Sequence, residues 1–221
     1  MPQPLTLFAH PFSSYCQKAL VALYENGTPF TLRLLERADP ATFAEFAALW
    51  PLKRFPLLVD EGRPIAEATI IIEHLGLHHP GPVRLIPDDP AAALEVRFVD
   101  RFFDNYVQTP QQRIIFDAIR EEGERDGKGV ADARAMLDTA YGWLEQRLAG
   151  REWAAGERFS LADCAAAPAL FYADWTHPIG AAFPNVRAYR SRLNARPSFA
   201  RAIDEARPYR PLFPLGAPDR D

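Results

Sequence analysis

The stretch Leu5-Thr-Leu-Phe-Ala-His-Pro-Phe-Ser-Ser-Tyr-Cys-Gln-Lys18 decides the fold of the first part of the chain. It opens with an apolar run of strand length, which His10-Pro11 ends, and a helical pattern follows over residues 15–26. The segment Ser13-Ser14-Tyr15-Cys16 therefore lies at a helix N-terminus. Free N–H groups and the helix dipole favour a bound anion there, although a serine in front of a helix also serves as a plain N-cap.

Strand and helix signals alternate over the first eighty residues. After the opening strand and helix, the pattern predicts strands at 30–35, 55–59 and 64–66 and helices at 42–49 and 69–75. Asp60-Glu61-Gly62 has the composition of a tight hairpin turn, so the last two strands are expected to be antiparallel. The first two flank a helix and are expected to be parallel. The sequence therefore predicts an α/β unit with a mixed four-stranded sheet.

A cluster of prolines and turn formers over residues 78–90 marks a linker, and the rest of the chain is helical. We expect a first domain at 1–79, a linker at 80–90 and an all-α domain at 91–221. Helices are predicted at 91–120, 132–148, 160–175, 184–195 and 198–206, with 121–129 as a solvated loop. Phe98, Phe102 and Tyr106 recur at helical spacing, as core residues do. Ser160 and Asp163 have the spacing of a capping box.

Composition narrows the possible functions. The 221 residues include 25 basic and 29 acidic side chains without a long run of either sign, so neither nucleic acid nor a membrane surface is an expected partner. Only Cys16 and Cys164 are present, too few for a disulfide framework, and Met1-Pro-Gln-Pro4 lacks the pattern of a signal peptide. We expect a cytoplasmic protein with a small ligand and no segment that spans a bilayer.

The order of these features resembles the cytosolic glutathione transferase superfamily over essentially the whole chain. That resemblance implies a thioredoxin-like α/β N-terminal domain followed by an all-α C-terminal domain, and a homodimer. It also implies glutathione as co-substrate, a small hydrophobic electrophile as second substrate, and no tightly bound cofactor.

Two segments carry the implied glutathione contacts. Arg54-Phe55-Pro56-Leu57-Leu58 resembles the family's loop with a cis proline, which makes Pro56 the candidate and gives the backbone of Phe55 to the cysteinyl part of glutathione. Arg54, or alternatively Lys53, suits the glycine carboxylate.

Glu67-Ala68 resembles the segment that binds the γ-glutamyl end, with alanine where the family usually has serine. Thr69, one residue later, is a candidate to cap the helix instead.

The segment from Ser13 to Cys16 resembles a glutaredoxin motif whose nucleophilic cysteine has become serine. The resemblance implies that Ser13 donates its hydroxyl to the glutathione sulfur and lowers the pKa of the bound thiol. Ser14 is the alternative donor, and Cys16 is either a second alternative catalytic group or a buried inert thiol.

The implied electrophile pocket lies between the domains, with Phe12, Phe103 and Tyr106 as candidate lining residues or, equally, as core residues.

His74, His78 and His79 are interpreted as cations at a helix C-terminus and not as metal ligands, so no metal is expected. Three functions stay open. The first is a glutathione transferase, the second a glutathione-dependent disulfide reductase or isomerase of the same fold, and the third a non-catalytic dimeric binding module.

Overall fold

The computed structural model describes residues 5–221. Met1–Pro4, where the sequence lacks a signal-peptide pattern, lie outside the described residues. The elements in chain order are β1 Leu5–Ala9, α1 Ser14–Glu25, β2 Phe30–Leu34, α2 Pro40–Leu49, β3 Leu57–Asp60, β4 Arg63–Ala66, α3 Ala68–His78, α4 Pro90–Phe102, the π-helix η1 Phe103–Gln108, α5 Thr109–Ala118, the short 3-10 helix η2 Glu122–Glu124, α6 Gly127–Arg147, α7 Leu161–Thr176, α8 Pro184–Ala195, α9 Pro197–Ala206 and the 3-10 helix η3 Arg207–Leu212.

The four strands form one mixed sheet in the order β2-β1-β3-β4. β1 and β2 are parallel, whereas β3 is antiparallel to both β1 and β4. The mixed four-stranded sheet predicted from the sequence is therefore confirmed, with the first two strands parallel and the last two antiparallel. The parallel pair requires the crossover helix α1, and the antiparallel pair is closed by the tight turn at Glu61-Gly62.

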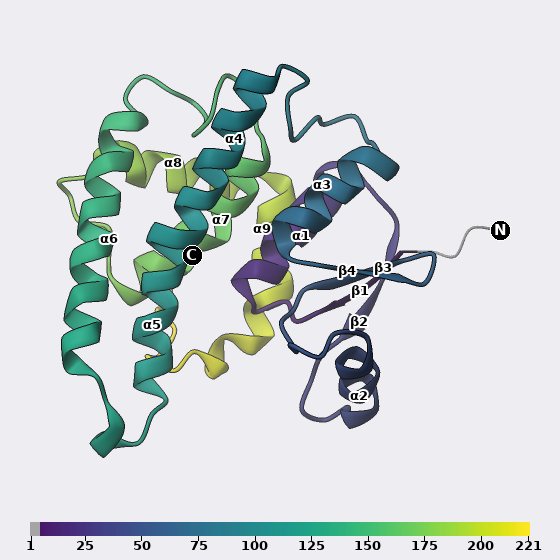
Figure 1. The fold of residues 1–221 in the computed structure, drawn as a ribbon. Helices are drawn as coiled ribbons and strands as arrows, with labels where there is room; N and C mark the ends of the chain where they lie inside the picture. Colours follow the sequence, from purple (N-terminus) through teal and green to yellow (C-terminus); the bar gives the residue numbers. More distant parts are fainter. Residues whose placement is uncertain (1–4) are drawn as a thin grey trace.

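Both faces of the sheet are covered, as Figure 1 shows. Alternate residues of β1 point to opposite faces. Leu7 and its neighbours on one face pack with α1 and α3, whereas Phe8 on the other face packs against Phe46 of α2. This arrangement explains why β1 has apolar residues on both faces of the sheet and does not alternate strictly.

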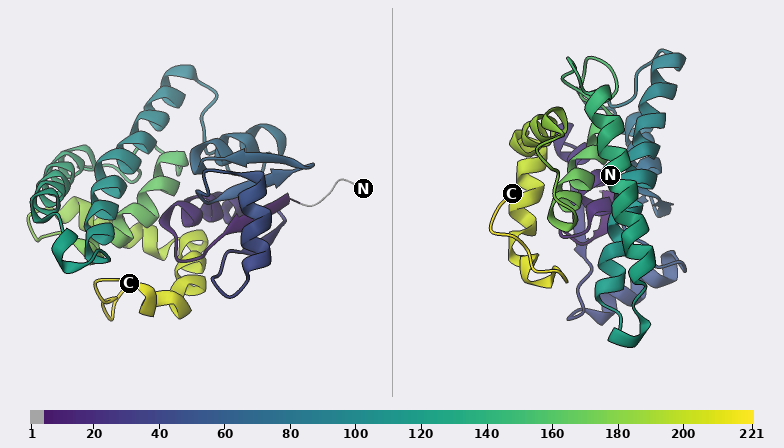
Figure 2. Two further views of the ribbon diagram at one scale, coloured as in Figure 1. Left: turned by 60° about the horizontal axis from the view of Figure 1, so that its bottom comes forward. Right: turned by 90° about the vertical axis from the view of Figure 1, so that its left-hand side faces the viewer.

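The second domain is built around α7, in which every residue is buried. The capping box predicted at its start is present, since Asp163 accepts hydrogen bonds from both the amide and the hydroxyl of Ser160, each at 2.9 Å. α7 packs against α1 as well as against α4, η1 and α8, so the two domains share one continuous core. In the right-hand view of Figure 2 the C-terminal segment and the helices α4 and α6 lie on opposite sides of the molecule.

Two details of the helical domain differ from the prediction. The single helix expected at 91–120 is divided into α4, the π-helix η1 and α5. α6 begins at Gly127, earlier than expected, because the side chain of Asp126 accepts the amide of Gly129 at 2.7 Å and caps the helix. Among residues 5–221, none of the helices has both the length and the apolar character that crossing a bilayer requires.

Candidate functional site

Strand register brings three predicted site segments to one edge of the sheet. Phe8 of β1 pairs with Leu57 of β3, and Leu57 pairs with Ala66 of β4. The chain leaves β1 toward Ser13, enters β3 from Pro56 and leaves β4 at Glu67. Residues separated by more than fifty positions in sequence therefore meet at the end of the sheet where α1 and α3 begin.

Ser13 is the N-cap of α1. Its backbone is extended (φ −91°, ψ 124°), and its Oγ accepts the amide of Cys16 at 3.4 Å. The loop before it is held by a hydrogen bond from the Ser13 amide to the His10 carbonyl at 3.0 Å. Ser13 is partly exposed, whereas Ser14 is only 9% exposed. Of the two hydroxyls, that of Ser13 is the more accessible to a ligand.

Cys16 is fully buried. Burial raises the pKa of its thiol to about 12, and hydrogen bonds with the Ser13 side chain and the His10 amide only partly oppose that rise. A thiol with this pKa is protonated at neutral pH and unreactive. The structure therefore favours the inert thiol among the alternatives for Cys16.

The peptide bond between Phe55 and Pro56 is cis, as the resemblance implied. Pro56 is buried at the start of β3, and the ring of Phe55 packs 6.4 Å from that of Phe46. Lys53 and Arg54, the two candidates for the glycine carboxylate, are both exposed in the loop before the cis bond.

Glu67 connects β4 to α3 with a positive φ of 71° and is exposed, whereas Ala68 is buried as the first residue of the helix. No side chain caps α3, so its first N–H groups face the site without an intrahelical partner. Tyr15, Glu67 and Ala68 line one cavity of about 290 Å³. This cavity links the start of α1 to the start of α3.

Thr69 does not cap α3, contrary to expectation. Its hydroxyl lies 2.9 Å from Lys18 Nζ and 2.9 Å from Asp100 Oδ2, inside a buried polar cluster. Lys18 Nζ forms ion pairs with Asp100 at 2.6 Å and with Asp104 at 2.8 Å. Burial lowers the pKa of Lys18 to about 8, and the charge of Asp100 opposes that shift.

This polar cluster of Lys18, Thr69, Asp100 and Asp104 joins α1 and α3 to α4 and η1, and sequence reasoning missed it. Two features of the sequence indicate such a cluster. One is a lysine in an otherwise apolar part of α1, and the other is a pair of aspartates four residues apart, at the end of α4 and the start of η1.

The three aromatic residues expected in the electrophile pocket have different surroundings. Phe12 is partly buried, with its ring 5.5 Å from that of Tyr172. Phe103 is fully buried in the helical core, so its ring offers no surface to a ligand. Tyr106 is 46% exposed and packs 5.4 Å from Phe102.

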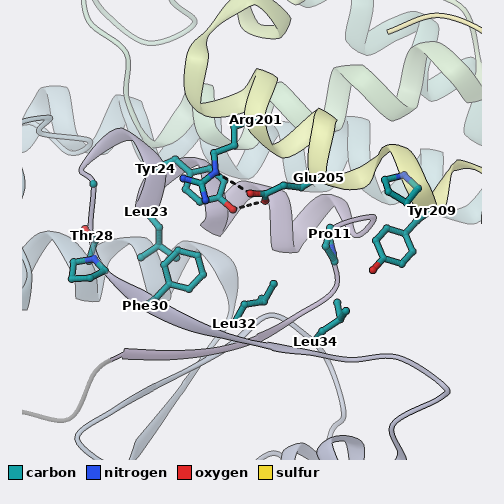
Figure 3. A pocket seen from close by; sticks show the side chains of 13 residues that line it. Pro11, Leu23, Tyr24, Thr28, Phe30, Leu32, Leu34, Arg201, Glu205 and Tyr209 are labelled. Carbon is teal, nitrogen blue, oxygen red and sulfur yellow. Dashed lines mark hydrogen bonds and ion pairs between the residues drawn. The ribbon is translucent and has the colours of Figure 1, made fainter.

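A separate groove of about 640 Å³ lies between β2 and the C-terminal segment, and none of the predicted site residues lines it. Figure 3 shows its apolar floor, with Phe30, Leu32 and Leu34 below Arg201 and Glu205 of α9. Glu205 accepts a hydrogen bond from Tyr24 at 2.5 Å and one from Arg201 at 2.9 Å.

Models of two protein families match the chain. The glutathione S-transferase N-terminal domain matches residues 7–83, and the glutathione S-transferase C-terminal domain matches residues 100–197. A glutathione S-transferase from Methylobacterium radiotolerans JCM 2831, solved in complex with glutathione sulfonate, is 30% identical and has a TM-score of 0.79. The match covers 91% of this chain and 95% of that one.

Several relatives with different names have about the same sequence identity to this chain. FtsZ-localized protein A of Caulobacter vibrioides is 29% identical, with 88% of each chain covered. A probable maleylacetoacetate isomerase of Vibrio cholerae is 28% identical over 75% of this chain and 78% of its own. A probable glutathione S-transferase of Nicotiana tabacum is 31% identical, but the match covers only 52% of this chain and 47% of that protein. Both family models, the shared fold and the cis proline at position 56 lead to one conclusion: the chain belongs to the cytosolic glutathione transferase superfamily.

Proposed function

We propose that this protein is a glutathione transferase in which Ser13 stabilises the thiolate of glutathione for attack on a small hydrophobic electrophile. The observation that carries the proposal is the position of Ser13, a partly exposed hydroxyl at the N-cap of α1. A hydroxyl can accept the Cys16 amide through a lone pair while its own hydrogen rotates toward a ligand sulfur. The positive end of α1 favours the same negative charge.

The proposed reaction forms one bond and breaks one bond at the electrophile. The glutathione thiol loses its proton to solvent, and the sulfur attacks an electrophilic carbon to form a C–S bond. The leaving group departs with the electron pair of its bond. A hydrogen bond to the thiolate raises the fraction of glutathione that is ionised at neutral pH, and more thiolate gives a faster attack. Such a reaction serves detoxification.

The remaining contacts follow from the segments at the sheet edge. We propose that Phe55, next to Pro56, offers its backbone to the cysteinyl part of glutathione and that Arg54 binds the glycine carboxylate. Glu67 and the amide of Ala68 would bind the γ-glutamyl end, since the first N–H groups of α3 are suited to a carboxylate. Phe12 and Tyr106 remain the proposed contacts of the electrophile.

Two alternatives are retained. A glutathione-dependent reductase or isomerase would use the same site, and similarity to a probable maleylacetoacetate isomerase supports it. A non-catalytic module would keep the fold without the reaction. In its favour, one relative is named for localisation with FtsZ and not for a reaction, and Ala68 lacks the usual hydroxyl. Glutathione titration separates the last alternative from the others, and an aromatic halide assayed beside a mixed glutathione disulfide separates the first two.

The experiment that tests Ser13 is a pH titration of the thiolate absorbance of bound glutathione. For Ser13→Ala we expect a raised thiol pKa and a conjugation rate lower by a factor of about 10²–10³, with nearly unchanged glutathione affinity. Ser14→Ala is the matched control and should leave the titration curve in place. An unchanged curve for Ser13→Ala would remove Ser13 from the mechanism, and a shift in Ser14→Ala alone would give the role to Ser14.

We further propose that the protein works as a cytoplasmic homodimer. Four large apolar residues of α3 and α4 are exposed, with exposed fractions between 48% and 77%. We call them the α3–α4 face; they are Ile70, Leu77, Leu94 and Phe98. The two helices are connected by a bidentate ion pair in which Arg97 donates to Glu73 at 2.9 and 3.0 Å. Exposed apolar surface of this kind typically marks a protein interface.

The two free buried cysteines are compatible with a reducing compartment.

A further inference from the structure

Two histidines of α3 and its C-cap meet a carboxylate at the turn of the β3–β4 hairpin. His74 Nε2 lies 2.8 Å and His79 Nε2 lies 2.7 Å from the same oxygen, Asp60 Oδ2. We propose that Asp60, His74 and His79 form a binding site for a divalent transition metal ion of the Zn²⁺ class. Within residues 5–221 this is the one group of at least three histidine, cysteine or acidic residues whose ligand atoms all lie within 4.8 Å of one another.

The separation of the three ligand atoms suits a zinc ion after a small adjustment. Zinc binds imidazole nitrogen and carboxylate oxygen at about 2.0–2.1 Å, and tetrahedral geometry then separates two ligand atoms by about 3.3 Å. Each nitrogen would therefore move about half an ångström away from Asp60 Oδ2, which small side-chain rotations accomplish. Nε2 is one of the two ring atoms by which histidine binds metals. In both imidazoles this atom already points toward Asp60 Oδ2.

The backbone holds the three ligands in place. Asp60 pairs with Arg63 across the hairpin, and the amide of His79 donates to the carbonyl of Leu75 at 2.8 Å at the end of α3. The side chains of His74 and Asp60 are 13% and 12% exposed, and that of His79 is 34% exposed. The inner part of the site is therefore shielded, and the His79 side provides a path for the ion.

The donor set decides which metals fit. Two imidazoles and one carboxylate suit Zn²⁺, Ni²⁺ or Cu²⁺, whereas Ca²⁺ and Mg²⁺ require a shell of oxygen ligands. The three side chains leave a fourth position for water. The site lies at the end of α3 opposite to Ala68, so it is separate from the proposed glutathione site and does not depend on the proposed transferase activity.

Isothermal titration of the full chain, without a polyhistidine tag and after treatment with a chelator, tests the proposal with Zn²⁺ as the probe. We expect one ion per chain with a Kd in the micromolar range or tighter, and a rise in Tm when Zn²⁺ is added. Asp60→Asn and His79→Gln should each weaken binding at least tenfold. His79 is the most exposed of the three ligands, so His79→Gln should fold normally, and circular dichroism of the metal-free variant verifies this.

His177→Gln is the matched control, because His177 also lies 2.8 Å from a carboxylate, that of Asp138, but Arg134 and not a second histidine lies beside it. This variant should bind Zn²⁺ like the parent. The proposal is overturned if the parent does not bind Zn²⁺ at 100-fold molar excess over the protein, or if folded His79→Gln binds it as tightly as the parent. Glutathione binding is measured in the parent and in all variants. If it is retained while Zn²⁺ does not bind, the metal site is excluded and the proposed function is not affected.

Discussion

Ala68 is the single residue that most directly limits the proposed γ-glutamyl contact. It is buried at the first position of α3, beside the helix N–H groups proposed to bind the γ-glutamyl carboxylate, where a serine hydroxyl would add a donor. Glu67 precedes it with φ at 71° and forms no side-chain cap, so the helix start has free donors but lacks a fixed hydroxyl. Backbone amides alone must therefore hold the carboxylate in the proposed complex.

We predict that Ala68→Ser strengthens glutathione binding. An added hydrogen bond to a charged group contributes about 1–3 kcal/mol, which corresponds to a Kd lower by a factor of about 5 to 150. Isothermal titration with glutathione measures the change. Ala68→Cys, which has similar size but a weak donor, is the control and should change the Kd much less. Equal Kd values for the parent and for Ala68→Ser would show that glutathione does not contact this position.

At the scale of elements, the π-helix η1 shows how one proline reshapes a long helix. Pro110 has no amide hydrogen, and in a continuous α-helix its ring would clash with the carbonyl four residues earlier. The chain instead widens over Phe103–Gln108, and Thr109 Oγ1 donates to the carbonyl of Asp104 at 2.8 Å. A proline inside an apolar helical pattern can also kink an α-helix without a π-helical segment. For this reason the sequence pattern predicts helix here but not its division.

Asp163, at the start of α7, has a larger structural role than a capping box alone. It is fully buried and accepts hydrogen bonds from the amide of Ala154 at 3.0 Å and from the phenol of Tyr189, in addition to both Ser160 donors. One carboxylate thus holds the loop before α7, the start of α7 itself and α8. The local spacing of residues 160 and 163 predicts the cap, whereas the contacts with residues 154 and 189 depend on tertiary packing.

We predict that Asp163→Ala lowers the free energy of unfolding more than Ser160→Ala does. Removing the carboxylate leaves several buried donors without an acceptor, at a cost of about 1–3 kcal/mol for each donor that stays unsatisfied. Loss of the Ser160 hydroxyl costs about 0.5–2 kcal/mol. Urea denaturation measures both. Glutathione affinity of the folded fraction should stay at the parent value for both variants, and a large loss of affinity with unchanged stability would contradict the structural assignment.

On the scale of the whole molecule, the cluster around Lys18 connects the two domains through charges that are hidden from solvent. Lys18 lies in α1, whereas Asp100 and Asp104 belong to α4 and η1. A buried cation and its partner carboxylates are costly to desolvate, and each depends on the other for compensation. The relative position of the domains, and with it the space between α1, α3 and η1 where the cavity at Glu67 lies, therefore depends on this cluster.

We predict that Lys18→Met lowers the free energy of unfolding by about 3–5 kcal/mol, because it removes the buried cation beside Asp100 Oδ1 and leaves both carboxylates with the half-exposed Arg101 as their neighbouring cation. Adding Asp100→Leu should restore a large part of that stability, since the exposed end of the cluster keeps the ion pair between Asp104 and Arg101. Urea denaturation of the two variants and the parent measures the effect. A loss below about 1 kcal/mol for Lys18→Met would mean that the ion pairs contribute little to the docking of the domains.

Local patterns explain most of what the sequence predicts in this molecule. Strand periodicity, the hairpin turn at Glu61-Gly62 and the spacing of Ser160 and Asp163 each depend on neighbouring residues. The ion pair between Lys18 and Asp104 spans 86 positions, and the hydrogen bond between His79 and Asp60 spans 19. Such contacts require knowledge of which elements pack together. A lysine in an apolar part of a helix indicates that it has a buried partner, but the local sequence does not identify that partner.

The exposure of Phe98 and Tyr106 illustrates the same limit. Helical spacing groups them with Phe102 as one stripe, yet Phe102 is 7% exposed whereas Phe98 and Tyr106 are 48% and 46% exposed. Periodicity identifies an apolar face but not what covers it. Phe98 belongs to the α3–α4 face, and we propose that a second copy of the chain packs against it.

We predict that the parent sediments as a dimer, with about twice the 24.8 kDa mass of the chain, at micromolar concentration. Introducing charge at the α3–α4 face with Leu94→Asp and Phe98→Asp together should shift the protein to the monomer, because buried carboxylates would face each other across the two-fold axis. Leu212→Asp is the control, since Leu212 is 63% exposed in η3 and belongs to a different surface. Analytical ultracentrifugation distinguishes the outcomes. A monomeric parent would exclude the dimer, and a double variant that stays dimeric would move the interface away from α3 and α4.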